Sequence, residues 1–177
     1  MRNKLILFLM LALFGSASFL RADEVQIGVG GTATNSYLPS YSLYNYSLTQ
    51  QIYTADEIGV GECTINSIAF YNSGSEKTRT YTMYLVNTDK ETFGGATDWI
   101  VVSAADQVFT GTVTMAPGAW NVFTLDTPFD YTGENLALIM DDNTGSWSSG
   151  LSCYVFDATA QALRVYSDGT DYDPMNL

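Results

Sequence analysis

Hydrophobic and polar residues alternate in short segments along most of the chain, and turn residues separate the segments. The clearest case is residues 80–86, in which Tyr81, Met83 and Leu85 alternate with threonine and tyrosine. A period of two is that of a β-strand and excludes an amphipathic helix. Further strands are predicted over residues 65–71, 99–102, 107–113, 120–125, 136–140, 153–156 and 163–166.

Two of these segments indicate how the strands are layered. Residues 136–140 are apolar on both sides, as in a central strand covered on both faces, whereas residues 107–113 keep a threonine-rich side that suits solvent. Helical periodicity is never sustained, so parallel crossovers are not expected. About eight or nine short strands predict an all-β fold, an antiparallel two-sheet sandwich of jelly-roll type.

The domain organisation follows from composition along the chain. Residues 37–53 are rich in tyrosine, serine, asparagine and glutamine, and we expect a long connection packed over one end of the sandwich, with a contact surface as the alternative. We find no boundary or repeat between residues 25 and 172, so residues 23–177 are predicted to be a single domain. Residues 171–177 are turn-like and contain no closing strand, which suggests a chain truncated from a longer polypeptide.

The N-terminus has the pattern of a secretory signal. A basic start with Arg2 and Lys4 precedes about ten apolar residues and then a stretch of small residues. The apolar stretch is too short to span a bilayer, and no second one follows. We expect residues 1–22 to be cleaved and the mature protein to be secreted or held at the cell surface, without a transmembrane segment.

Charge and composition exclude several classes of function. The chain has 7 Lys+Arg, 19 Asp+Glu and no His. Without the predicted signal, four basic residues remain, and the net charge falls from -12 to about −15. Such a field repels phosphate, so nucleic acid is not an expected partner. The absence of His removes the Ser/His/Asp and Cys/His nucleophile systems and His-ligated metal sites.

Cys63 and Cys153 are the only cysteines. An exported chain can form disulfides, and these two residues are the only internal pair available. A domain of this size does not need such a crosslink. Either a Cys63–Cys153 bridge or two buried free thiols is therefore expected.

One loop carries the best ligand-binding candidate. Trp147 lies among glycines and serines directly after Asp141, Asp142 and Asn143. An exposed indole can stack on the apolar face of a sugar while neighbouring polar groups bind its hydroxyls, and the alternative is that Trp147 folds back over the edge of the sandwich. Trp99 and Trp120 are followed by strand-like apolar residues and are expected in the core.

Calcium is the one metal that the sequence suggests. Oxygen ligands cluster in residues 141–146 and again in Asp168, Asp171 and Asp173, and Ca²⁺ takes six to eight oxygens. Neither cluster fits an EF-hand, and turn capping explains such residues equally well. No organic cofactor is expected: residues 28–33 match a dinucleotide-binding glycine pattern, but no helix is predicted after them.

Several segments together resemble a known family. They are residues 40–47, 50–53, 68–72, 86–90, 97–100, 141–146 and 164–170. They look like the N-terminal β-sandwich module of secreted, multidomain Bacteroidetes surface proteins. The resemblance implies neighbouring fibronectin type III or adhesin-like domains in a longer polypeptide, and it supplies no catalytic residues.

Three functions are therefore considered. The first is a non-catalytic extracellular module for adhesion or glycan binding, with a glycan or another cell-surface ligand as partner. The second is a structural spacer that binds nothing. The third is a small carboxylate-dependent glycoside hydrolase, the one enzyme class that tolerates the lack of His. The glutamates of this chain are all predicted in turns or at strand ends, so an enzyme is not expected.

Overall fold

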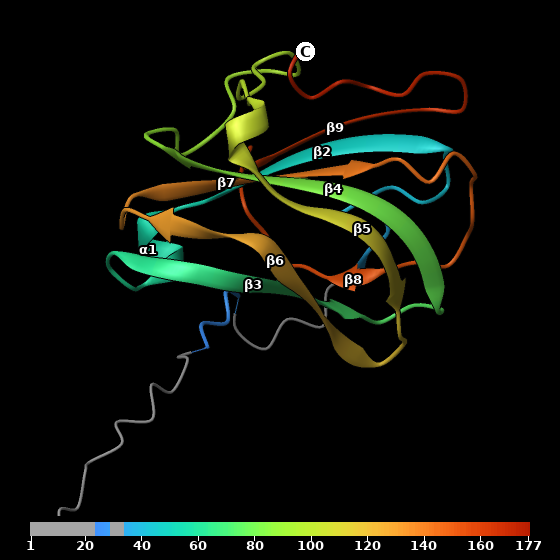
Figure 1. Cartoon of the computed structure of the whole chain (residues 1–177), viewed down its shortest axis with the longest axis horizontal. Helices are drawn as coiled ribbons and strands as arrows, with labels where there is room; N and C mark the ends of the chain where they lie inside the picture. Colours follow the sequence, from blue (N-terminus) through green and yellow to red (C-terminus); the bar gives the residue numbers. More distant parts are fainter. Residues whose placement is uncertain (1–23, 29–33) are drawn as a thin grey trace, which may run out of the picture.

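The protein is a two-layer β-sandwich (Figure 1). A computed structural model describes residues 24–28 and 34–177, and the predicted signal at 1–22 lies outside these residues. No helix in the described part is long and apolar enough to cross a membrane. In chain order the elements are β1 (Thr34–Asn35), β2 (Tyr46–Tyr53), α1 (Ala55–Ile58), β3 (Cys63–Asn72), β4 (Lys77–Thr88), η1 (Ala104–Asp106), β5 (Gln107–Met115), β6 (Ala119–Tyr131), β7 (Asn135–Asp142), β8 (Cys153–Tyr154) and β9 (Ala162–Ser167).

The strand order is that of a jelly roll. One sheet has the order β1-β8-β3-β6 and the other β5-β4-β7-β2-β9, and all pairs are antiparallel. The first strand pairs with the eighth, the second with the seventh, the third with the sixth and the fourth with the fifth. These nested pairs are a long antiparallel ribbon rolled into two sheets, and β9 extends the second sheet. The predicted fold class is confirmed.

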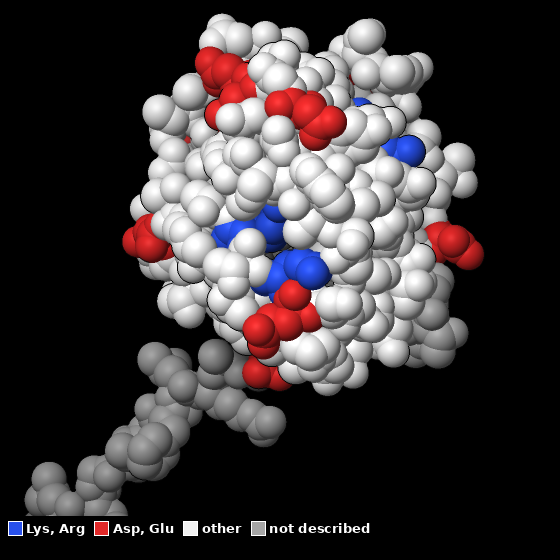
Figure 2. Space-filling model, turned by 90° about the vertical axis from the view of Figure 1, so that its right-hand side faces the viewer, with Lys and Arg blue, Asp and Glu red and all other residues white. Residues whose placement is uncertain are grey.

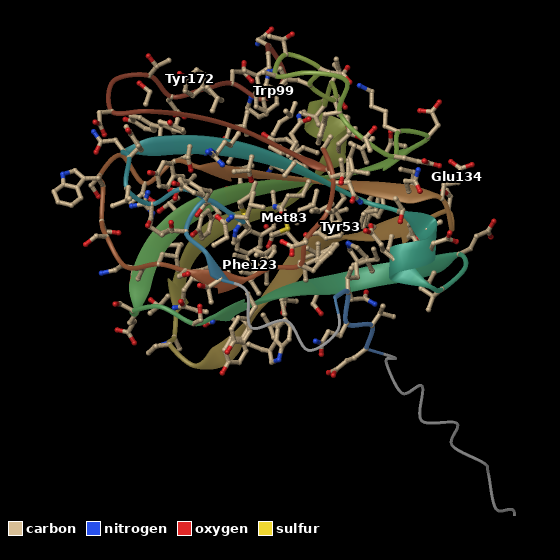
Figure 3. The ribbon with its side chains drawn as sticks, turned by 180° about the vertical axis from the view of Figure 1, so that it is seen from behind. Tyr53, Met83, Trp99, Phe123, Glu134 and Tyr172 are labelled. Atoms are coloured by element: carbon tan, nitrogen blue, oxygen red, sulfur yellow. The ribbon has the colours of Figure 1, made fainter. Side chains whose placement is uncertain are left out.

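The main core lies between the two sheets. Tyr81, Met83 and Leu85 project from β4 into this space, where they meet Phe123 and Leu125 of β6. Figure 3 shows Met83 and Phe123 facing each other across the interior. The predicted alternation in residues 80–86 is therefore correct, and it assigns the odd-numbered side of β4 to the interior.

A second core covers the outer face of the five-stranded sheet. Ile100 and Val102, from the segment between β4 and β5, pack on Leu48, Ile52 and Ile139 of the sheet below. This segment and the C-terminal residues lie across the outer side of β9 and β2 in Figure 1. The central strands β2 and β7 are therefore buried on both faces. The prediction that residues 136–140 form such a strand is confirmed.

The prediction for residues 37–53 is wrong in its second half. Residues 46–53 form β2, a central strand whose six middle residues are buried, rather than a surface connection. The sequence hides this because the buried side chains include Ser47, Thr49 and Gln50. Each finds a backbone partner outside β2: Ser47 accepts from the Tyr41 amide, Thr49 donates to the Pro39 carbonyl and Gln50 bonds Ile100. Buried polar groups persist in a sheet when they are paired in this way.

The strand predicted at residues 99–102 is absent, because a side chain takes the place of a neighbouring strand. The Ile100 amide donates to Gln50 Oε1 at 2.7 Å, and Gln50 Nε2 donates to the Ile100 carbonyl at 2.8 Å. Both backbone groups of Ile100 are satisfied without a ladder. The remaining predicted strands form, with longer bounds for most and a shorter one for β8.

The disulfide alternative is not realised, and both cysteines are free thiols; the expected burial is right for Cys153 and wrong for Cys63, which is exposed. Cys63 is the first residue of β3, and Cys153 pairs with Asn72, the last residue of the same strand. Nine residue steps of about 3.3 Å separate the two ends by about 30 Å, far beyond the reach of a disulfide. Burial raises the pKa of the Cys153 thiol to about 12.

Gln50→Leu tests the side-chain link that holds the covering segment. The substitution leaves the buried amide and carbonyl of Ile100 without partners, so we expect it to lower the free energy of unfolding by about 2 kcal/mol. Urea denaturation followed by intrinsic fluorescence measures this change. Gln107→Leu is the matched control at an exposed position and should change stability by less than about 0.5 kcal/mol. Equal effects of the two substitutions would contradict the role of Gln50.

Candidate functional site

Trp147 is the most exposed tryptophan in the described part of the chain. It lies in the loop of residues 143–152 between β7 and β8, at the right-hand end of the sandwich in Figure 1, with 64% of its side chain exposed. The neighbouring loop, residues 36–45, carries Leu43 with an exposed fraction of 40%. The predicted exposure of Trp147 is observed.

The backbone on both sides of Trp147 is fixed. Gly145 donates its amide to the Asn45 carbonyl at 3.0 Å, and Ser148 donates its amide to the Ser42 carbonyl at 2.7 Å. Ser42 in turn donates its hydroxyl to the Ser148 carbonyl at 3.0 Å. The two loops therefore run antiparallel beside each other, and this brings the Leu43 and Trp147 backbones close together.

The β3–β4 turn holds the far end of the same loop. The Ser75 amide donates to the Gly150 carbonyl at 2.6 Å, and the Gly74 amide donates to the Ser152 carbonyl at 3.2 Å. A Cβ atom at Gly74 would lie 2.1 Å from the Gly150 oxygen, so only glycine permits this approach. The loop is anchored at its middle and at its end.

A buried ion pair lies beneath the loops. Arg79 of β4 is 1% exposed and Asp142 of β7 is 0% exposed, and Arg79 Nε donates to Asp142 Oδ2 at 2.8 Å. The other two guanidinium nitrogens donate to the carbonyls of Ser146 and Tyr44, one in each loop. Thr144 donates its hydroxyl to the second Asp142 oxygen at 2.6 Å. The residue directly before Trp147 is thus bonded to a charge inside the sandwich.

The ionisation of the pair depends on these contacts. Burial raises the pKa of Asp142, and the Arg79 charge and the hydrogen bonds from Thr144 and Arg79 oppose that rise. Desolvating two charges is costly unless their remaining polar atoms are bonded, as they are here. Sequence reasoning did not single out Arg79, although its odd number places it on the inward side of β4 with Tyr81 and Met83.

The surface around Trp147 is largely uncharged. Residues 145–150 are glycine, serine and tryptophan only. Figure 2 views the molecule from this end: two basic groups lie near the centre of the face, an acidic group borders one of them, other acidic groups lie toward the margin, and the rest of the surface is uncharged.

The structure separates the polar residues predicted to assist Trp147. Asp141 and Asp142 are the last two residues of β7 and not part of a turn, and both are buried. Because successive strand residues face opposite sides, Asp142 points between the sheets and Asp141 points to the outer face of the five-stranded sheet. Asn143 donates to Asp141 Oδ2 at 3.0 Å on that outer face. With these contacts, none of the three side chains is positioned to bind a ligand that stacks on Trp147.

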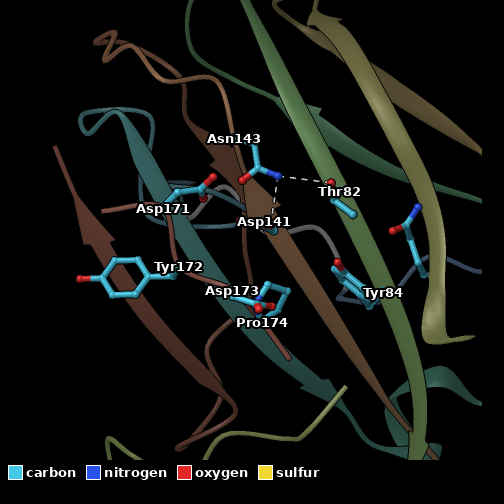
Figure 4. Close-up of a pocket in the computed structure, with 9 residues that line it drawn as sticks. Thr82, Tyr84, Asp141, Asn143, Asp171, Tyr172, Asp173 and Pro174 are labelled. Atoms are coloured by element: carbon cyan, nitrogen blue, oxygen red, sulfur yellow. Dashed lines mark hydrogen bonds between the residues drawn. The ribbon is translucent and has the colours of Figure 1, made fainter. Parts of the chain in front are cut away.

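Asp141 and Asn143 instead line an acidic hollow of about 260 Å³. Asp171, Asp173 and Tyr84 line it as well (Figure 4). Burial raises the pKa of Asp141 to about 7, and the negative charges of Asp171, Asp142 and Asp173 add to the rise, whereas the hydrogen bond from Asn143 lowers it. The pKa of Asp171 is also raised, by burial and by Asp173. The hollow therefore holds a carboxyl group that titrates near neutral pH.

The predicted calcium set is divided in the same way. Asp171 and Asp173 line the hollow, but Asp168 accepts a hydrogen bond from the Asn45 amide at 3.2 Å and does not line it. Within residues 24–28 and 34–177, no three acidic or cysteine side chains are grouped so that they could hold a metal ion.

Replacing Arg79 tests the buried ion pair. Arg79→Met leaves Asp142 charged and buried and removes the bonds to both loops, so we expect a loss of about 3–5 kcal/mol in the free energy of unfolding. Lys90→Met is the control, because the Lys90–Asp98 pair is partly exposed and should contribute little. Chemical denaturation of both variants measures the two changes in the free energy of unfolding. Similar losses for Arg79→Met and Lys90→Met would contradict the importance of the buried pair.

Asp141→Asn tests the pKa of the hollow. Folding raises the pKa of Asp141 above its unfolded value of about 3.9, so the folded state binds more protons, and this contribution to stability is lost as pH rises from about 4 to about 7. The asparagine variant lacks that loss. We expect it to match the wild type near pH 4 and to exceed it by on the order of 2–4 kcal/mol above pH 8. Asp157→Asn, at an exposed position, controls for the removed charge; a pH-independent difference for Asp141→Asn would refute the assignment.

Comparison with known proteins adds no relative to this geometry. No protein-family model matches the chain, and no curated protein or solved structure matches it.

Proposed function

We propose that this protein is a non-catalytic, exported adhesion module that binds a neutral glycan through Trp147. The observation that carries the proposal is a tryptophan with 64% of its side chain in solvent on a backbone bonded on both sides. The module is part of a larger surface protein in this proposal. The resemblance to Bacteroidetes surface modules and the expected signal at residues 1–22 support that context.

Exposure and rigidity together favour a binding role. Leaving a large apolar side chain in water is energetically unfavourable. A loop that served only to connect two strands could bury this side chain or carry a smaller residue at the same position. The Ser146 and Ser148 backbones are held by Arg79 and Ser42, so a ligand would not have to order the loop. Preorganised aromatic side chains of this kind carry much of the free energy of binding at interfaces.

The chemistry around Trp147 favours a neutral ligand with hydroxyl groups. The flanking residues offer the hydroxyls of Ser146 and Ser149 and backbone groups but no charge, whereas the Ser148 hydroxyl is buried. An indole presents an apolar face and one N–H donor, which suits the alternating C–H and O–H surface of a sugar. A charged ligand would find no ion-pair partner in residues 145–150.

Trp147→Ala tests the proposal directly. We expect it to abolish binding on a glycan array while lowering the free energy of unfolding by less than about 1 kcal/mol, because the side chain is exposed. Val101→Ala, which truncates an apolar side chain that is 76% exposed on the covering segment, is the matched control and should bind like the wild type. A stability loss of about 3 kcal/mol or more would instead show that Trp147 is part of the core.

The same assay separates the other two functions. A spacer domain would bind no glycan even as the wild type. A glycoside hydrolase would release new reducing ends from a bound glycan, and Asp141→Asn would stop that release because it removes the carboxyl group that titrates near neutral pH. Binding without release supports the non-catalytic module.

A further inference from the structure

A row of aromatic side chains crosses the outer face of the four-stranded sheet. Tyr154 of β8, Tyr71 of β3 and Trp120 of β6 are neighbours on adjacent strands, and we call these three residues the aromatic row. The rings of Tyr71 and Tyr154 stack at 4.5 Å with an interplanar angle of 8°. The Trp120 ring stands at 81° to Tyr71, with the centroids 5.7 Å apart.

The row is exposed because of the register of β6. Phe123 and Leu125 point into the core, so the even-numbered residues Trp120 and Val122 point outward. The exposed fractions are 51% for Trp120, 59% for Val122 and 41% for Tyr154. The prediction that Trp120 belongs to the core is therefore wrong.

The rows next to the aromatic row are uncharged, and the first acidic residues on the outward side of β6 are Asp126 and Asp130, beyond Thr124. The next outward pairs along β3 and β6 are Ala69 with Val122 and Ser67 with Thr124. All the side chains in these rows are neutral, although the chain has a net charge of -12. The other sheet's outer face is covered by the chain's own segment around Ile100, whereas the aromatic row keeps a large part of its surface in water.

We propose that the aromatic row is a second binding surface, which takes the apolar face of a neutral polysaccharide chain. This surface is on a sheet face rather than on the loops around Trp147, so the inference does not rest on the site proposed above. Trp120 supplies the largest apolar contact area, and Tyr71 and Tyr154 hold the row together by stacking. Sugar hydroxyls can form hydrogen bonds with the side-chain hydroxyls of this face, which are those of Tyr71, Tyr154 and Thr124.

The charge pattern selects a polysaccharide over a protein. Protein interfaces are enriched in arginine as well as in tyrosine and tryptophan, and no arginine lies in the rows described here. The rows described here contain hydroxyls and small side chains in place of charges. A neutral sugar polymer needs no ion pair and can lie across an open face, so it matches this surface on both counts.

The test uses the whole mature chain in native affinity gels that contain hydroxyethyl cellulose, mixed-linkage β-glucan, galactomannan or dextran, with polygalacturonate as an anionic comparison. We expect retardation by at least one neutral polymer and not by the anionic one. Trp120→Ala and Tyr154→Ala should each raise the dissociation constant about tenfold or more, the effect of losing one strong contact. Trp120→Phe should retain part of the binding, and Val101→Ala should retain all of it.

Two further measurements keep the outcomes distinct. In a Trp147→Ala background, retardation that persists and is lost on adding Trp120→Ala supports the second surface, whatever the fate of the first site. Loss of all retardation from Trp147→Ala alone overturns it. Val122→Asp, at a position that is 59% exposed, places a charge on the face without opening the core and should also abolish binding. If Trp120→Ala leaves retardation unchanged, or only removes self-association measured by light scattering, a polysaccharide is not the occupant.

Discussion

The ion pair between Arg79 and Asp142 is the interaction on which the loops at the Trp147 end of the sandwich depend. Two charges inside a sandwich are tolerated only when their own remaining polar atoms are bonded. The pair meets this requirement by recruiting Thr144 from its own strand end and backbone carbonyls from the two neighbouring loops. Because the buried guanidinium needs these carbonyls as hydrogen-bond partners, the loop backbones are fixed. Trp147 is held in an exposed position as a result.

The outer faces of the two sheets differ in how their apolar side chains are shielded from water. The outer face of the five-stranded sheet is apolar along β2 and β7, and the chain covers it with its own segment around Ile100. That covering segment lacks a strand partner, and buried Gln50 supplies the missing hydrogen bonds. The outer face of the four-stranded sheet instead carries Trp120, Tyr71 and Tyr154 in contact with one another. Aromatic stacking lowers the cost of their exposure without removing it.

The candidate sites show how strand parity redistributes residues that are adjacent in sequence. Asp141 and Asp142 look alike in the sequence, but one lies in an acidic hollow with a pKa near 7 and the other forms the interior ion pair. Trp120 was expected in the core but points outward, whereas Phe123 of the same strand points inward. The residues that come together, such as Arg79 with Ser146 or Tyr71 with Tyr154, are distant in the chain, so composition and spacing could not pair them.

The amino-acid sequence by itself determined that this protein is a β-sandwich, because the alternation in residues 80–86 is a local signal of a strand with one buried face and the apolar run in 136–140 is a local signal of a strand covered on both faces. It also marked Trp147 as exposed, since only small polar residues surround it. The tertiary structure alone decided that the polar segment 46–53 is a central strand, because Gln50 and its neighbours are satisfied by distant backbone groups. The tertiary structure also decided that Cys153 lies about 30 Å from Cys63. The pairing of β8 with the far end of β3 sets this distance, and the local sequence does not.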